Sequence, residues 1–309
     1  MMISEPTGTA LLYSGGMLTD LHGKTSHGLL RYSKRFQILG VVDYKHAGQM
    51  SNEIISNCQD DVPIFSDINK AIEGLGIKPD FLVIGLSFHG GQLPESHRGN
   101  IKQALKAGIH VVSGLHQLLG EDPDFAETAK EFGSIIYDIR RPKETKDLSF
   151  WSGKVMDLET PRIAVLGTDC ALGKRTTCQF LIQACDESNI KAEIIYTGQT
   201  GFLQGFKHGF LFDATLNDFV TGELEKAIME CDAISQRHPQ VRERQAGRKQ
   251  HFRRIVPTGP GALTLLPGSG PALFPDRIPA ARLVPSEDSQ AFSPEECLAL
   301  FTYRSDWYG

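Results

Sequence analysis

One segment near the middle of the chain most constrains the fold, because a short apolar strand leads directly into a glycine-bounded loop and then into a helix. Ile163–Leu166 is the expected strand, and Thr176–Ala184 has a helical pattern. This order of elements predicts a phosphate-binding P-loop. The predicted loop consists of Gly167, Thr168, Asp169, Cys170, Ala171, Leu172, Gly173, Lys174, Arg175, Thr176 and Thr177. We expect these residues to bind a nucleotide or a nucleotide-like cofactor.

The residue types in this loop suit that chemistry. Glycines let backbone N–H groups converge on phosphate oxygens, and the helix N-terminus adds the positive end of a dipole. Lys174 supplies a charge for the outer phosphates. Thr176 or Thr177 supplies a hydroxyl that could bind Mg²⁺, and Thr176 is our candidate metal ligand.

The loop departs from the common P-loop in two ways. Five residues separate Gly167 from Gly173, whereas four are standard, and Arg175 occupies the usual hydroxyl position. The spacing and the Gly-Thr-Asp start resemble the dethiobiotin synthetase and cobyric acid synthase group of P-loop enzymes. Members of that group keep a hydroxyl directly after the lysine.

The first half of the chain alternates apolar runs with helical patterns. The expected strands are Thr9–Tyr13, Ile38–Val42, Phe81–Leu86, Ile109–Val112 and Ile135–Asp138, and the expected helices lie around Leu29–Arg35, Ile101–Ala107 and Glu121–Glu131. Such alternation is typical of βαβ units and a parallel sheet. We therefore predict an α/β fold with two domains, a Rossmann-like domain at residues 1–150 and a P-loop NTPase-like domain at residues 151–236. The charged stretch Arg140–Asp147 is the expected linker.

Polar residues follow several expected strands in this first domain, where open parallel sheets bind ligands. Asp43 could bind a ribose or simply end its strand, since the first turn lacks a dinucleotide-binding glycine motif. The segments Phe88–Pro94 and Ser113–His116 could line a cleft, or could be loops with hydrogen-bonded histidines.

In the second domain, the strand Ala192–Tyr196 leads to Gln199 and Thr200, which we predict to contact substrate. Asp218 lies near the start of the expected helix Phe219–Cys231, where it could be a general base or a helix cap. Asp169 is the second candidate catalytic carboxylate.

The composition limits the classes of partner. The chain has 309 residues and a net charge of −5, and no apolar run approaches the length of a membrane helix. None of the six cysteines forms a C-x-x-C pair, which favours reduced thiols and a cytoplasmic location. We expect a small-molecule substrate, no nucleic acid or membrane partner, and a homo-oligomer.

Several motifs together resemble the DgcN-like family, also described as domain of unknown function 1611. They are GTDCALGKRTT at 167–177, YTGQTGFLQG at 196–205, LNDFVTGELE at 216–225, SGLHQLLGEDPDF at 113–125, and Lys24-Thr25 followed by Gly28-Leu29-Leu30-Arg31-Tyr32. The resemblance covers about residues 9–236. It implies a Rossmann-like domain followed by a P-loop domain, and an activity of N-acetylating D-amino acids such as D-glutamate.

Acetyl-CoA or ATP is therefore the expected ligand of the loop, because coenzyme A carries phosphates that a backbone nest binds as readily as those of ATP. The leading hypothesis is an N-acetyltransferase acting on an amino acid. Two alternatives are an ATP-dependent ligase or kinase resembling dethiobiotin synthetase, and a non-catalytic nucleotide-binding protein.

The segment 237–309 is an atypical end. Between Arg237 and Arg254 there are seven Lys or Arg residues against one acid, and eight of the sixteen prolines lie between Pro257 and Pro294. This composition predicts a divergent or disrupted end of the P-loop domain, with Leu263–Leu266 as its one plausible strand. Limited proteolysis tests this hypothesis, which a tail as resistant as the first 230 residues would contradict.

Overall fold

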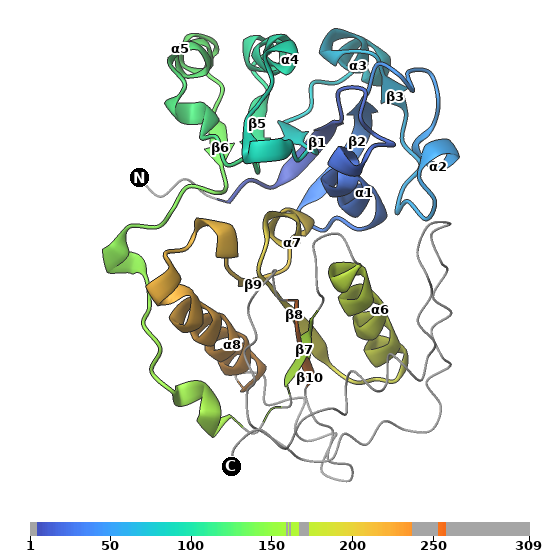
Figure 1. Ribbon diagram of the computed structural model, residues 1–309. Coiled ribbons are helices and arrows are strands. Elements are labelled where there is room, and N and C mark those ends of the chain that lie inside the picture. Colours follow the sequence, from blue (N-terminus) through green and yellow to red (C-terminus); the bar gives the residue numbers. More distant parts are fainter. Residues whose placement is uncertain (1–4, 159, 161, 167–172, 237–252, 258–309) are drawn as a thin grey trace. The chain divides into compact units, whose positions relative to one another are not determined.

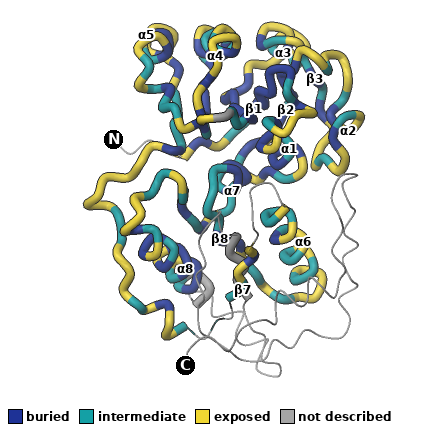
Figure 2. Tube along the Cα trace, in the orientation of Figure 1, coloured by how far each residue is buried: buried dark blue, intermediate teal, exposed yellow. Residues whose placement is uncertain are grey.

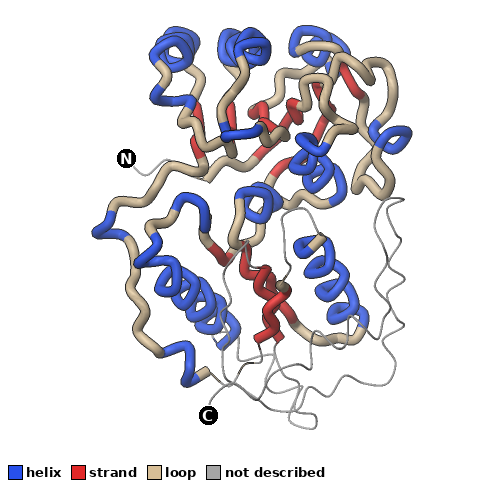
Figure 3. The backbone as a smooth tube through the Cα atoms, viewed as in Figure 1, coloured by secondary structure: helices blue, strands red, loops and turns tan. Residues whose placement is uncertain are grey.

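The computed structural model describes residues 5–158, 160, 162–166, 173–236 and 253–257. All of them belong to one compact unit, residues 1–268. They form two parallel sheets with helices on both faces of each (Figures 1 and 3). The α/β class predicted from the sequence is confirmed.

The first sheet has six strands in the order β3-β2-β1-β4-β5-β6, and all its strand pairs are parallel. Its strands are β1 (Gly8–Tyr13), β2 (Phe36–Val42), β3 (Ile64–Phe65), β4 (Phe81–Ile84), β5 (His110–Ser113) and β6 (Ile136–Asp138). Its helices are α1 (Lys24–Arg31), α2 (Ser51–Ile54), α3 (Ile68–Leu75), α4 (Glu95–Lys106) and α5 (Pro123–Phe132). This strand order is that of a Rossmann fold.

Two apolar layers explain why the strands of this sheet read as continuous apolar runs. Side chains of α3, α4 and α5 pack on one face, with Leu11 and Leu82 in that layer. Side chains of α1 pack on the other face, with Leu12 and Val83. Strand β1 is buried from Ala10 to Tyr13, and Figure 2 shows it among buried segments. Because both faces are covered, neither shows the alternating pattern of a half-exposed strand.

One predicted helix is displaced. The pattern around Leu29–Arg35 indicated a helix there, but α1 begins earlier, at Lys24, and ends at Arg31. Beyond that point Tyr32 is extended, and the hydroxyl of Ser33 donates to the carbonyl of Phe36 at 2.8 Å. This turn directs the chain into β2.

The second sheet has four strands in the order β7-β10-β8-β9. Its elements are β7 (Arg162–Val165), α6 (Lys174–Glu187), β8 (Ala192–Tyr196), α7 (Gln199–Gln204), β9 (His208–Gly209), α8 (Val220–Gln236) and β10 (Arg253–Pro257). Helix α6 packs with β7 and β8 through Cys178, Val165 and Ile194, whereas α8 packs on β8 through Ile228 and Ile195. The two helices flank the strands in Figure 1.

Strand β10 lies in the segment 237–309, where the sequence analysis expected Leu263–Leu266 to be the one plausible strand. Arg253–Pro257 forms a strand between β7 and β8, with Ile255 paired to Ile163 and Ile194. No apolar run marks this segment in the sequence, but pairing on both sides favours a strand over so short a segment. Pro257, which has no N–H to donate, is its last residue. The predicted strand Leu263–Leu266 lies outside the described residues, as do 237–252 and 258–309.

Candidate functional site

The N-terminus of α6 is the described part of the predicted phosphate loop. Gly173 precedes the helix in a left-handed conformation, with φ of 82°, which a side chain would strain. Its carbonyl accepts from the amide of Thr177 at 2.8 Å, so the helix begins directly after the glycine. Residues Gly167–Leu172, including Asp169, lie outside the described residues.

The first turn of α6 carries Lys174 and Arg175 and no acidic residue. Two cations at a helix N-terminus, where the dipole is positive, favour an anionic ligand. The hydroxyl of Thr177 donates to the Gly173 carbonyl at 3.2 Å, so it caps the local backbone. Thr176 remains the predicted Mg²⁺ ligand. Within the described ranges, no cluster of three or more His, Cys, Asp or Glu side chains is placed to hold a metal ion.

Arg175 extends from α6 toward α1 and α7. A Cβ atom at Gly28 of α1 would lie 2.7 Å from its Nη2 and 2.9 Å from Cγ2 of Thr200 in α7, so glycine permits this close approach. The Nε of Arg175 is shielded from solvent and has no hydrogen-bond partner among the described residues. Burial, and then repulsion by Arg31, lower the pKa of Arg175 to about 10, and the guanidinium is still charged at neutral pH.

The two predicted substrate-binding residues lie in different surroundings. Thr200 is buried, and its hydroxyl lies 3.4 Å from that of Thr25 in α1. Gln199 instead accepts a hydrogen bond from Nη2 of Arg140 at 2.7 Å. Only Thr200 therefore joins Arg175 at the junction of α1, α6 and α7.

Arg140 is a residue that the sequence analysis missed, since it was assigned to the linker. It is buried, and besides Gln199 it donates to the Gly114 carbonyl at 2.7 Å and to Asp213 at 2.8 Å. The signal that could have found it is its position two residues after β6, at the carboxyl edge of the first sheet. Arg140 joins that edge to the segments around α7 and β9.

His116 is a fourth partner of Arg140, whose Nη1 lies 3.1 Å from its Nε2. Burial, and then the Arg140 charge, lower the pKa of His116, so the ring is neutral at pH 7. A guanidinium donates only, and Nε2 therefore accepts while Nδ1 carries the proton. The alternative of hydrogen-bonded histidines is favoured for the segment Ser113–His116.

Asp43 has a structural role at the end of β2. Its fully buried carboxylate accepts from the amides of Gly16 at 2.9 Å and Leu18 at 3.0 Å, and it lies 2.8 Å from Nδ1 of His46. These bonds close the loop that follows β1. The geometry favours a strand-end Asp over a ribose ligand.

The switch point of the first sheet, between β1 and β4, is filled from within the chain. Ser26 of α1 donates from its amide to the Gly85 carbonyl at 3.0 Å, and its hydroxyl lies 2.8 Å from that of Ser14. A Cβ at Gly85 would lie 1.8 Å from the Ser26 hydroxyl oxygen. The place where Rossmann folds bind a dinucleotide thus contains α1.

The candidate base Asp218 lies in a 3₁₀ turn directly before α8 and is exposed. Among the described residues, no hydrogen bond or ion pair joins Asp218 to α6. Its catalytic role stays a prediction, as does that of Asp169.

The motif LNDFVTGELE holds the interdomain segment. Glu223 accepts from Lys143 Nζ at 2.6 Å and from the amide of Ser149 at 2.9 Å. Glu225 accepts from the amide of Val155 at 3.0 Å. Burial raises the pKa of Glu223, but Lys143 and the Ser149 amide outweigh it, so the pKa is lowered overall and the carboxylate is charged.

Comparison with known proteins adds two family matches. A family model described as a Rossmann-like domain of unknown function, DUF1611_N, matches residues 44–142. The model described as the DUF1611_C P-loop domain matches residues 149–274. The second match continues to residue 274, beyond Gln236, where the sequence analysis placed the end of the resemblance.

Two curated relatives are named D-glutamate N-acetyltransferase. The relative from Tritonibacter scottomollicae is 32% identical over 151 residues, which is 49% of this chain and 44% of that protein. The relative from a Pseudoalteromonas species is 30% identical over 150 residues, 48% of this chain and 44% of that protein. The matched part of the chain therefore spans less than half the length of these relatives.

A solved structure is similar over most of the chain. It is a crystal structure of a DUF1611 family protein from Anabaena variabilis, with a TM-score of 0.67 and 33% sequence identity. The match covers 85% of this chain and 68% of that one.

The length and apolar character of the helices can be compared with those of membrane-spanning helices. Among the described residues, no helix combines the length and the apolar character needed to cross a membrane.

Proposed function

Because this chain belongs to the DUF1611 family, we propose that it is an N-acetyltransferase that transfers an acetyl group from acetyl-CoA to a D-amino acid such as D-glutamate. The observation that carries the proposal is the match of about half the chain to two relatives named D-glutamate N-acetyltransferase. A homo-oligomeric assembly is part of this proposal.

The N-terminus of α6 supports a phosphate-bearing acyl donor. Lys174 stands on a helix start that has no acidic residue in its first turn, so the local field is positive. Coenzyme A carries a pyrophosphate and a 3′-phosphate that suit such a field. We assign Lys174 to these phosphates, and ATP with Mg²⁺ at Thr176 is the competing ligand.

The transfer needs an amine in its neutral form. The amine nitrogen attacks the thioester carbonyl carbon, the new C–N bond forms, and the C–S bond breaks. The amine proton passes to a base, and the departing thiolate takes up a proton. Asp169 and Asp218 are our candidates for the base, since a carboxylate can hold that proton.

A binding panel and an activity assay test this function. We expect acetyl-CoA and CoA to raise the melting temperature, since a ligand at 100 times its Kd stabilises by about 2.7 kcal/mol. We expect N-acetyl-D-glutamate to form from acetyl-CoA and D-glutamate. Failure of the intact protein in both measurements rejects the proposal, and Mg²⁺-dependent ATP turnover would favour the ligase or kinase alternative.

Lys174→Ala tests the assignment of the loop. It should abolish the thermal shift caused by acetyl-CoA. Lys70→Ala, which removes an exposed cation paired with Glu73 on α3, is the matched control and should leave the shift unchanged.

A further inference from the structure

We propose that the junction of α1, α6 and α7 is the binding site for the amino-acid substrate, with Arg175 as the receptor for its carboxylate. The site is formed by Arg175 and Gln179 of α6, Gly28 of α1, and Thr200 and Gln204 of α7. This assignment rests on the proposed function and identifies where the enzyme binds the amino acid that accepts the acetyl group. Arg175 thereby has a role distinct from that of its neighbour Lys174.

The first argument is that, among the residues the structure describes, no carboxylate pairs with Arg175. Its Nε is shielded from solvent and has no hydrogen-bond partner among the described residues, and after burial the next cause that lowers its pKa is the like charge of Arg31. A half-buried guanidinium with a shielded Nε and no carboxylate partner is costly, and groups perturbed in this way cluster at functional sites. An oxyanion would accept from the planar fork of donors that arginine presents.

The second argument is that two further shielded polar atoms have no partner among the described residues, one on Gln204 beside Gly28 and one on Gln179 in α6. Gln204 donates from Nε2 to the Gly28 carbonyl at 2.7 Å, and its Oε1 has no partner among the described residues. That hydrogen bond also fixes which end of the amide is oxygen. Gln179 lies one helical turn after Arg175, on the same face of α6, and its buried Nε2 likewise has no partner.

The set of donors and acceptors fits an amino acid better than a phosphate. Arg175 and Gln179 offer donors for a carboxylate, whereas Oε1 of Gln204 offers an acceptor. A phosphate ester at neutral pH brings oxygen acceptors, and it would leave Oε1 unsatisfied. An α-amino acid brings both a carboxylate and an ammonium group, which donates.

The packing of Gly28 explains how a charged group comes to lie between three helices. A side chain there would clash with both Arg175 and Thr200. Leu203 of α7 lies in the apolar layer under α1, so α7 is held firmly against the first sheet. Because the partnerless atoms are shielded from solvent, entry of an amino acid requires α6 to move away from α1 and α7.

Binding measurements with Arg175→Met test the assignment. By isothermal titration, we expect the Kd for D-glutamate to rise at least tenfold, while the Kd for acetyl-CoA changes less than threefold. Arg175→Lys should lose less D-glutamate affinity than Arg175→Met, since it keeps a charge but lacks the planar fork. Arg141→Met, which removes an exposed arginine paired with Glu121, is the control and should change neither constant.

Two further ligands separate the possible sources of the anion. Glutarate, which lacks the ammonium group, should bind more weakly than D-glutamate and should also depend on Arg175. Pyrophosphate binding should not depend on Arg175. If Arg175→Met abolishes pyrophosphate binding and spares D-glutamate binding, Arg175 belongs to the phosphate site and the proposal is overturned.

The design separates failure of this site from failure of the proposed function. If the wild-type protein acetylates D-glutamate and Arg175→Met keeps its KM for D-glutamate, the site assignment alone is wrong. If no acetylation occurs but D-glutamate binds in an Arg175-dependent way, the transferase function alone is wrong. If the wild-type protein binds neither D-glutamate nor glutarate, the site assignment fails.

Discussion

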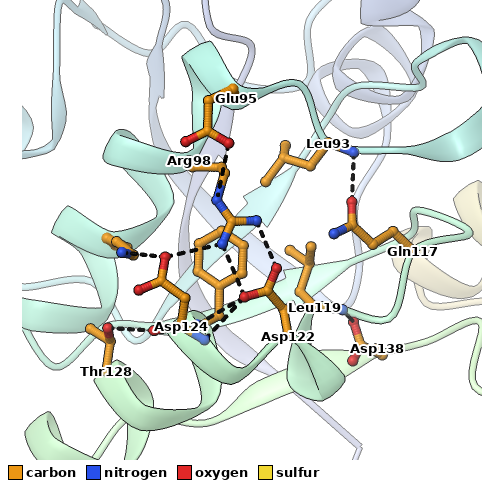
Figure 4. A network of polar contacts seen from close by, with 11 residues as sticks. Leu93, Glu95, Arg98, Gln117, Leu119, Asp122, Asp124, Thr128 and Asp138 are labelled. Carbon is orange, nitrogen blue, oxygen red and sulfur yellow. Dashed lines mark hydrogen bonds and ion pairs between the residues drawn. The ribbon is translucent and has the colours of Figure 1, made fainter.

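Arg98 and Arg175 are both arginines between helices, but their surroundings differ in every respect. Arg98 of α4 donates to both carboxylate oxygens of Asp122, at 2.7 and 2.9 Å, and to Asp124 at 3.0 Å (Figure 4). Its guanidinium also lies over the ring of Phe125, 4.3 Å from the ring centre. Arg175 has Gly28 and Thr200 beside it and a shielded Nε without a partner.

The difference separates a structural arginine from a binding one. At the α4–α5 junction each nitrogen of the guanidinium lies beside a carboxylate, so the charge stabilises the packing of the two helices. At the junction of α1, α6 and α7 the charge weakens the packing and is available to a ligand. Substituting Arg98 should therefore lower the free energy of unfolding, whereas substituting Arg175 should raise it.

Arg98→Met should have the largest effect on stability. It leaves Asp122, which is mostly buried, without its bidentate partner, and we expect a loss of about 2 kcal/mol in the free energy of unfolding. Urea denaturation measures this loss. A change below about 0.5 kcal/mol would mean that the α4–α5 contacts in Figure 4 do little for stability.

Low pH should reduce the difference in stability between wild type and Arg98→Met. Arg98 lowers the pKa of Asp122, and Lys102 followed by Arg98 lowers the pKa of Asp124. A carboxylate with a lowered pKa in the folded state contributes stability above its unfolded pKa, and this contribution is lost as pH falls through the folded pKa. The difference in the free energy of unfolding between wild type and Arg98→Met should therefore narrow as the pH falls from 7 toward 3. A gap that is constant with pH would contradict the ion pairs.

Arg175→Met should stabilise the protein by about 1 kcal/mol, since it replaces a half-buried charge, whose shielded Nε has no described partner, with an apolar chain of similar length. The measurement is the melting temperature without ligand, which should rise. A lower melting temperature would show that Arg175 has a structural role like that of Arg98.

Gly28→Ala provides the smallest and most local test. Alanine normally stabilises a helix relative to glycine, but here its Cβ would contact the Arg175 guanidinium. We expect Gly28→Ala to be less harmful in the Arg175→Met background, by about 0.5 kcal/mol in a double-mutant cycle. Additive effects would place Arg175 away from α1.

Much of the fold was predictable because its signals are local. The apolar runs at 9–13, 38–42 and 81–86 lie on a sheet covered on both faces, so each reads as a strand by itself. The strand, glycine and helix at 163–184 likewise lie next to one another in sequence.

The parts that were missed depend on distant partners. Strand β10 exists through pairing with β7 and β8, which lie far earlier in the chain. Arg140 reads as one of several linker charges, and only the fold brings Gly114, Gln199 and Asp213 around it. The sequence showed that Arg175 departs from the usual P-loop residue, but its burial against Gly28 comes from the packing of three helices.

The attachment of the interdomain segment to α8 determines where the chain can be divided. Glu223 binds Lys143 and Ser149, and Gly222 lies so close to Ser149 that a Cβ would be 1.9 Å from its carbonyl oxygen. Residues from Lys143 onward therefore complete the fold around α8. A fragment that begins at residue 151 would leave a charged carboxylate with neither of its partners, whereas one that begins at residue 143 would retain both.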